Sequence, residues 1–258
     1  MKSLIKKIFN TSLGIEVRNI LGIRPVPMSI NSIHSLSSVS DAFCWRTDNN
    51  FTTVFKYSDI FNLFYKTENS YVELHFYTKE NKFIKKIVIE NLGYSNELII
   101  NSNFLDGLKD CGSFYIYHLT TDKIGNENII SNKCYVGYSK NNSLHSFVHG
   151  NTHARFININ NHKNIEQTDI IKMTFFKNQK YKIQNFFRNL DKSELFFVNP
   201  TSKKIRFSIN GKNYFLSSGC STIINTTKDE TIDIKSNCLF FRPLIFNYKD
   251  DYIDVYHG

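Results

Sequence analysis

The chain has 258 residues, a net charge of +9 and a high aromatic content of 15%. It has no run of 18 apolar residues, which excludes an ordinary transmembrane helix. Its basic residues are dispersed and form no known reader motif, so we expect no nucleic-acid partner. The five cysteines form no CxxC pair, which indicates reduced thiols in a cytoplasmic protein. The sequence has no phosphate-cradling Gly-rich loop and no zinc spacing, so we expect no cofactor.

The first 24 residues predict a short amphipathic helix. Leu4, Ile5, Ile8 and Phe9 form an apolar stripe beside three lysines. Such a helix binds an anionic membrane surface, which would place the protein at the inner membrane. The alternative is that the stripe packs on the protein itself. A Ser- and Asn-rich linker follows, up to residue 40.

Short strand patterns fill the rest of the chain, because Phe, Tyr, Ile and Val suit pleated, half-buried surfaces. Residues 58–65 fit a short helix or a strand, and residues 158–167 look like a polar loop. Asn210-Gly211 is a strong signal for a type I′ hairpin. The predicted strands are 52–57, 71–78, 83–90, 97–101, 112–119, 133–138, 146–148, 195–198, 204–209, 214–216, 221–225, 231–234, 238–246 and 252–256.

An approximate internal repeat organises these strands. The first copy runs from ELHFYTKENKFIKKIVIE (73–90) through ELIIN (97–101) to CGSFYIYH (111–118). The second runs from ELFFVNPTSKKIRFSING (194–211) through STIIN (221–225) to CLFFRPLIF (238–246). We therefore predict an all-β fold of two antiparallel β-sandwich units, 41–160 and 161–258, after an N-terminal helix and linker, 1–40.

The segment HSFVHGNTHAR is the most unusual local stretch. In an unbroken strand, one face would carry a polar ladder that suits sugar hydroxyls or a carboxylate. The members of this ladder are His145, Phe147, His149, Asn151, His153 and Arg155.

Two other interpretations of this segment remain open. On a strand, histidines four residues apart lie about 13 Å apart, too far to share a metal ion. Gly150, Asn151 and Thr152 disfavour the helix that would bring them together, so we expect no metal. Alternatively, Gly150-Asn151 is simply a turn with the histidines at its rim.

A second candidate is the segment around Trp45, Arg46 and Asp48. An exposed Trp stacks on sugar faces, while Arg and Asp bind hydroxyls. The favoured alternative is a buried Trp with an Arg–Asp pair at a turn. Asp41, at the start of the segment, could serve as an acid/base group, as could Asp48.

Several segments resemble proteins of bacterial surface-polysaccharide biosynthesis clusters. The opening MKSLIKKIFN is similar to their lysine-rich amphipathic starts. WRTDNNFTTVF (45–55), SFVHGNTHARF (146–156), FFVNPTSKKIRF (196–207) and FFRPLIF (240–246) are similar to β-sandwich proteins of those clusters. The resemblance implies a glycan or a biosynthetic enzyme as partner, and it supplies no catalytic residue.

The sequence thus favours an accessory β-sandwich protein that recognises a glycan or a partner enzyme. One alternative is a carbohydrate-active enzyme with His149, His153 and Arg155 near an Asp41 or Asp48 acid/base. Another is a structural module that assembles as a homo-oligomer through exposed strand edges.

Overall fold

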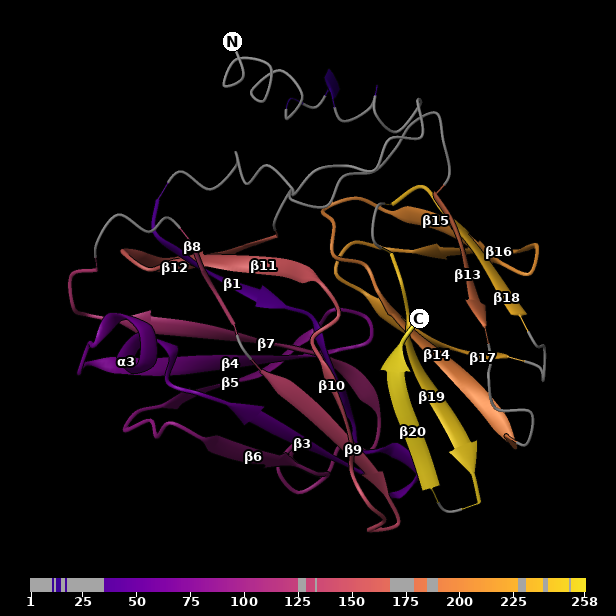
Figure 1. Ribbon diagram of the computed structural model, residues 1–258, viewed down its shortest axis with the longest axis horizontal. Coiled ribbons are helices and arrows are strands. Elements are labelled where there is room, and N and C mark those ends of the chain that lie inside the picture. Colours follow the sequence, from indigo (N-terminus) through magenta and orange to yellow (C-terminus); the bar gives the residue numbers. More distant parts are fainter. Residues whose placement is uncertain are drawn as a thin grey trace.

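A computed structural model shows an all-β protein built from five small four-stranded sheets (Figure 1). It describes Thr11, Leu13, Gly14 and Val17 and the ranges 35–124, 129–132, 134–167, 179–184, 190–226, 231–238, 241–250 and 252–258. The predicted apolar stripe of residues 4–9 lies outside the described residues.

Three of the sheets come from the first part of the chain. Their orders are β12-β11-β1-β8, β10-β9-β3-β6 and β2-β7-β4-β5. The strands are β1 (Ser37–Asp41), β2 (Phe43–Arg46), β3 (Phe51–Tyr57), β4 (Ser70–Thr78), β5 (Phe83–Ile89), β6 (Asn96–Ile100), β7 (Cys111–Thr120), β8 (Ile129–Ser131), β9 (Tyr135–Lys140), β10 (Ser146–His149), β11 (His153–Asn158) and β12 (Asn161–Gln167).

Two further sheets come from the second part, with the orders β13-β18-β15-β16 and β17-β14-β19-β20. Their strands are β13 (Gln179–Gln184), β14 (Lys192–Val198), β15 (Ile205–Ile209), β16 (Lys212–Leu216), β17 (Ser221–Thr226), β18 (Thr231–Ser236), β19 (Leu244–Lys249) and β20 (Tyr252–His257). The predicted closing strand is confirmed at an edge, where β20 pairs only with β19 among the strands that the structure describes.

The five sheets are arranged as a five-bladed β-propeller of small sheets, so the prediction of two β-sandwich units is wrong. None of the five described sheets consists of four strands consecutive in the chain. Pairing between distant segments decided the architecture, and the alternation of apolar residues carries no information about it. The division at residue 160 stays a prediction.

The internal repeat is only partly reproduced in space. In both copies the opening strand pairs antiparallel with the closing strand, β4 with β7 and β14 with β19. The rest of the opening blocks differs, because β4 and β5 form a hairpin within one sheet whereas β14 and β15 belong to different sheets. The middle blocks differ too, because β6 pairs with β3 outside the sheet of β4 whereas β17 pairs with β14 itself. Segments with similar local sequence patterns therefore pair with different strands in the two copies.

Three local predictions have clear outcomes. The Asn210-Gly211 hairpin is confirmed, with φ of 46° and 83° at the turn between β15 and β16. The polar loop predicted at 158–167 is wrong, because β12 pairs with β11 there. Residues 58–65 contain the short helix α3 (Ile60–Tyr65), whose N-cap Asp59 accepts a hydrogen bond from the Asn62 amide at 3.0 Å.

Aromatic side chains fill two hydrophobic cores. The larger core contains Phe43, Phe55 and Phe114, with ring centroids 4.9–5.3 Å apart. It also takes Phe246 of β19, so both parts of the chain contribute to it. The smaller core centres on Phe197, Phe207 and Phe241. Four of the five cysteines are buried, as expected for small apolar side chains, and all five are free thiols.

Candidate functional site

The histidine-rich segment does not form the continuous strand that the polar ladder required. Gly150, Asn151 and Thr152 interrupt it, so β10 ends in one sheet and β11 begins in another (Figure 1). The backbone of Ala42 fixes the break by accepting from the Asn151 amide at 3.2 Å and donating to the Thr152 carbonyl at 3.0 Å. The predicted one-faced ladder is therefore divided.

The break brings a subset of the predicted residues around one cavity of about 420 Å³, which we call the imidazole pocket. It lies where β1, β8, β9 and β10 approach the start of β11. Its lining residues are Asp41, Ser131, Asn132, Cys134, Tyr135, His149 and His153.

Asp41 and His153 form the polar centre of the imidazole pocket. They face each other across the β1–β11 pairing, and His153 Nδ1 lies 2.8 Å from Asp41 Oδ1. Gly150 permits this position, because a Cβ there would lie 2.4 Å from the Asp41 Cβ. His153 Nδ1 makes no hydrogen bond in this contact, so the imidazole and the carboxylate both keep capacity to bind ligand hydroxyls.

His149 and Tyr135 form an exposed aromatic edge of the same pocket. They are cross-strand partners on β10 and β9, with ring centroids 4.8 Å apart. Tyr135 is 49% exposed, so part of its ring is open to solvent beside the pocket. An exposed ring beside hydrogen-bonding groups is suited to the apolar face of a sugar.

The C-terminal His257 stacks beside this edge, 6.5 Å from His149 between ring centroids. Burial, the Arg242 cation and His149 together lower the pKa of His257 from 6.5 to about 4. The terminus is fixed, since the Gly258 amide donates to the Pro243 carbonyl at 3.0 Å. His257 is therefore a neutral, ordered imidazole at neutral pH.

Cys134 also lines the pocket, and its surroundings do not activate it as a nucleophile. Its Sγ lies 4.0 Å from Nε2 of the buried His118. Burial lowers the pKa of His118 from 6.5 to about 3, so this imidazole is neutral. A neutral imidazole supplies no charge to stabilise a thiolate.

The Trp45 segment lies elsewhere and serves the fold. Trp45 is fully buried and its Nε1 donates to the Tyr77 carbonyl at 2.9 Å. Arg46 pairs with Asp48 at 2.7 Å, the turn pair that the alternative interpretation anticipated, and it also donates to Glu194 at 2.6 Å. These side chains do not line the imidazole pocket.

The remaining ladder residues are dispersed. His145 is exposed in the connection before β10, with its ring 6.0 Å from Phe147. Asn151 is buried and its Nδ2 donates to the Arg242 carbonyl at 2.9 Å. Arg155 points away to the tyrosines Tyr77 and Tyr115.

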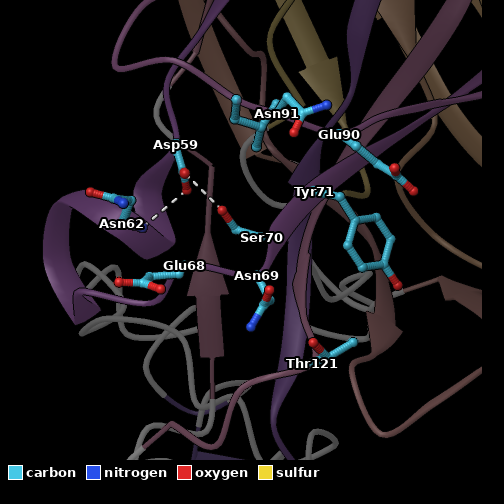
Figure 2. A pocket seen from close by; sticks show the side chains of 10 residues that line it. Asp59, Asn62, Glu68, Asn69, Ser70, Tyr71, Glu90, Asn91 and Thr121 are labelled. Atoms are coloured by element: carbon cyan, nitrogen blue, oxygen red, sulfur yellow. Dashed lines mark hydrogen bonds between the residues drawn. The ribbon is translucent and has the colours of Figure 1, made fainter.

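A second cavity, of about 380 Å³, lies beside α3 (Figure 2). Asp59, Glu68 and Glu90 give it an acidic lining, and Tyr71 stands next to Glu90. Asp59 is already engaged by the Ser70 hydroxyl at 2.7 Å and by the cap of α3. We favour the imidazole pocket because its central groups are not used to hold a helix or turn.

The described residues contain no group of three or more His, Cys, Asp or Glu side chains placed to hold a metal ion. No helix in the described part of the chain has the length and apolar content needed to cross a bilayer. No protein-family model, curated protein or solved structure matches this chain.

Sequence reasoning missed Tyr135, Asn132 and His257. One signal could have found Tyr135, because the hairpin between two predicted strands sets His149 opposite it. No local signal places Asn132 or His257 near the pocket, since their approach depends on strands far apart in the chain.

Proposed function

We propose that the protein is a glycan-binding protein and that the imidazole pocket holds one saccharide unit. The observation that carries the proposal is the combination of the exposed Tyr135–His149 edge with the polar Asp41–His153 pair in one cavity of about 420 Å³. A ring face that meets apolar C–H groups and polar groups that meet hydroxyls are what a sugar requires. An accessory role in surface-glycan biosynthesis rests on the sequence resemblance.

Calorimetric titration of the folded protein with neutral and acidic oligosaccharides tests this proposal. Tyr135→Ala and His153→Ala should each weaken binding about tenfold or more, because each removes a contact worth about 1–2 kcal/mol. His145→Ala is the matched control, since His145 is exposed in the same segment but lies outside the pocket lining. A protein that binds no oligosaccharide, or variants that bind like the control, would refute the proposal.

A carbohydrate-active enzyme is the second candidate, favoured by the 2.8 Å contact between Asp41 and His153. In that case the imidazole would act as general base, with Asp41 orienting it. Asp41→Asn separates the two functions, because the amide keeps the shape of the carboxylate and one acceptor oxygen but removes the negative charge. Catalysis predicts a loss of turnover of about 10²-fold or more with little change in binding. Pure binding predicts no turnover of any bound oligosaccharide by either protein.

A further inference from the structure

One face of the sheet β13-β18-β15-β16 (Figure 1) is basic and open to solvent. Side chains along its strands alternate between two faces, as the pleat requires. The inner set packs into the smaller core, where Ile183, Ile205 and Ile232 are at most 5% exposed. Among the described residues, the outer set includes five cations and one carboxylate, all exposed: Lys180, Lys182, Lys204, Arg206, Lys235 and Asp233.

The strand register places four of these cations in one oblique row. Lys180 on β13 is directly opposite Lys235 on β18, so their Cβ atoms are about 5 Å apart. Lys235 is opposite Ser208 on β15, which puts Arg206 at the diagonal position about 7–8 Å away. Lys204 lies two residues beyond Arg206. Two strand spacings and four residue rises separate Lys180 from Lys204, about 16 Å in all. We call these four cations the basic stripe.

An exposed aromatic ring marks one end of the basic stripe. Phe215 on β16 is directly opposite Arg206 and is 61% exposed. The Lys204 Nζ lies 4.8 Å from the centroid of the Phe215 ring. This contact shows that Lys204, which directly precedes β15, lies on the same face as Arg206. The row of charges therefore ends beside an apolar ring face that is open to solvent.

The protein does not neutralise the basic stripe within its described part. None of the four cations forms an ion pair with a described carboxylate. The carboxylate of this face, Asp233, pairs instead with Lys182 at 3.6 Å, and both side chains are more than half exposed. An ion pair so open to water is weak. Like charges directly opposite each other, such as Lys180 and Lys235, destabilise a sheet, and a bound anion would remove that repulsion.

We propose that the basic stripe binds a linear acidic polysaccharide, whose successive anionic groups meet successive cations while one sugar ring rests on Phe215. A row of cations is complementary to anions that repeat along a polymer, because each added contact is charge-assisted. Single-stranded nucleic acid is another linear polyanion, but its sites use several exposed aromatic rings for successive bases. The described part of this face offers one such ring, since Tyr181 and Tyr214 pack towards the smaller core.

The basic stripe shares no residue with the lining of the imidazole pocket. The inference therefore does not rest on the function proposed for that pocket.

The test is calorimetric titration of the full chain with polygalacturonate, dextran, a single-stranded DNA oligonucleotide, and vesicles of phosphatidylserine and phosphatidylcholine. Polygalacturonate should bind saturably, more tightly than the DNA or the vesicles and at least about tenfold more tightly than the neutral dextran. Its affinity should fall as salt is added, because salt screens exposed charges. Equal binding of dextran, or binding that salt does not weaken, would overturn the stripe. Tighter binding of DNA or of the vesicles would overturn the assignment to a polysaccharide.

Paired variants assign the binding to these residues. Lys235→Gln combined with Arg206→Gln removes the middle of the stripe, and affinity for polygalacturonate should fall about tenfold or more at low salt. Both side chains are exposed, so urea unfolding should not change. Lys82→Gln combined with Lys109→Gln is the matched control, because it removes the same charge from two exposed lysines outside this sheet. An equal loss in the control would reveal an effect of net charge and overturn the proposal. Tyr135→Ala should leave this affinity unchanged, and a larger loss than in the stripe variant would place the polymer in the imidazole pocket instead.

Discussion

The buried Arg46 network offers the sharpest test of how the two parts of the chain are held together. Arg46 is 1% exposed and donates to Asp48, to Glu194 at 2.6 Å and to the Tyr248 hydroxyl at 2.9 Å. Glu194 also accepts from Tyr248 at 2.5 Å and from Lys192 at 2.8 Å. Glu194 and Tyr248 belong to β14 and β19, so the network joins strands about 150 residues or more from Arg46.

Replacement of Glu194 should cost substantial stability. Removing one partner of a buried ion pair costs about 3–5 kcal/mol of unfolding free energy. We expect Glu194→Ala to cost about 3 kcal/mol, because Arg46 keeps the Asp48 carboxylate as a second partner. Glu194→Gln keeps an acceptor oxygen and should cost about 2 kcal/mol. Urea unfolding at pH 7 measures both values.

The same variant has a defined pH dependence. Burial alone would raise the pKa of Glu194, but the Arg46 charge and the hydrogen bonds from Lys192, Tyr248 and Arg46 lower it from 4.5 to about 2. Because the pKa in the folded state is depressed, the stabilisation is complete above about pH 4.5 and disappears as the pH falls towards 2. Each tenfold change in proton affinity is worth about 1.4 kcal/mol, so the ionised Glu194 contributes at most about 3 kcal/mol. The difference in unfolding free energy between wild type and Glu194→Gln should therefore shrink between pH 4.5 and 2.

Glu97→Gln is the control for this experiment. Glu97 pairs with Lys56 at 3.4 Å, but both side chains are about half exposed, so the change should cost less than about 1 kcal/mol. If Glu194→Gln costs no more than Glu97→Gln, the buried network does not stabilise the fold.

Four further outcomes are expected. Gly150→Ala should lower the free energy of unfolding by about 1–3 kcal/mol in urea titrations, because the new Cβ would collide with Asp41; an unchanged value would contradict the packing described. Tyr138→Phe should cost about 1 kcal/mol, since the Cys44 carbonyl loses its buried partner; equal stability would exclude that bond. NMR titration should show His257 neutral down to about pH 4, so wild type should lose stability between pH 6.5 and 4 that His257→Gln retains. Deleting residues 1–24 should reduce salt-sensitive co-sedimentation with anionic vesicles, whereas equal sedimentation of the truncated chain would exclude the membrane anchor.

Local sequence patterns determined most of the strands and some of the turns. Alternating apolar residues at 71–78 and 112–119 correspond to β4 and β7, and Asn210-Gly211 makes the turn that its positive φ angles allow. These features follow from interactions between near neighbours, so a short window of sequence contains them. The buried Trp and the Arg–Asp turn pair near residue 45 were also accessible in this way.

Tertiary structure alone decided which strands pair and which side chains meet. β4 and β14 have the same kind of strand pattern, but β4 forms a hairpin with β5 whereas β14 lies between β17 and β19. The difference arises because long-range packing decides which strands pair. Gly150 looks locally like a turn residue, yet its effect is to admit the Asp41 side chain beside His153. Arg155, two residues further on, instead reaches the tyrosines of another sheet. Side chains that alternate along a strand share a face only while the strand continues, and its break at 150–152 divided the predicted ladder between two sheets.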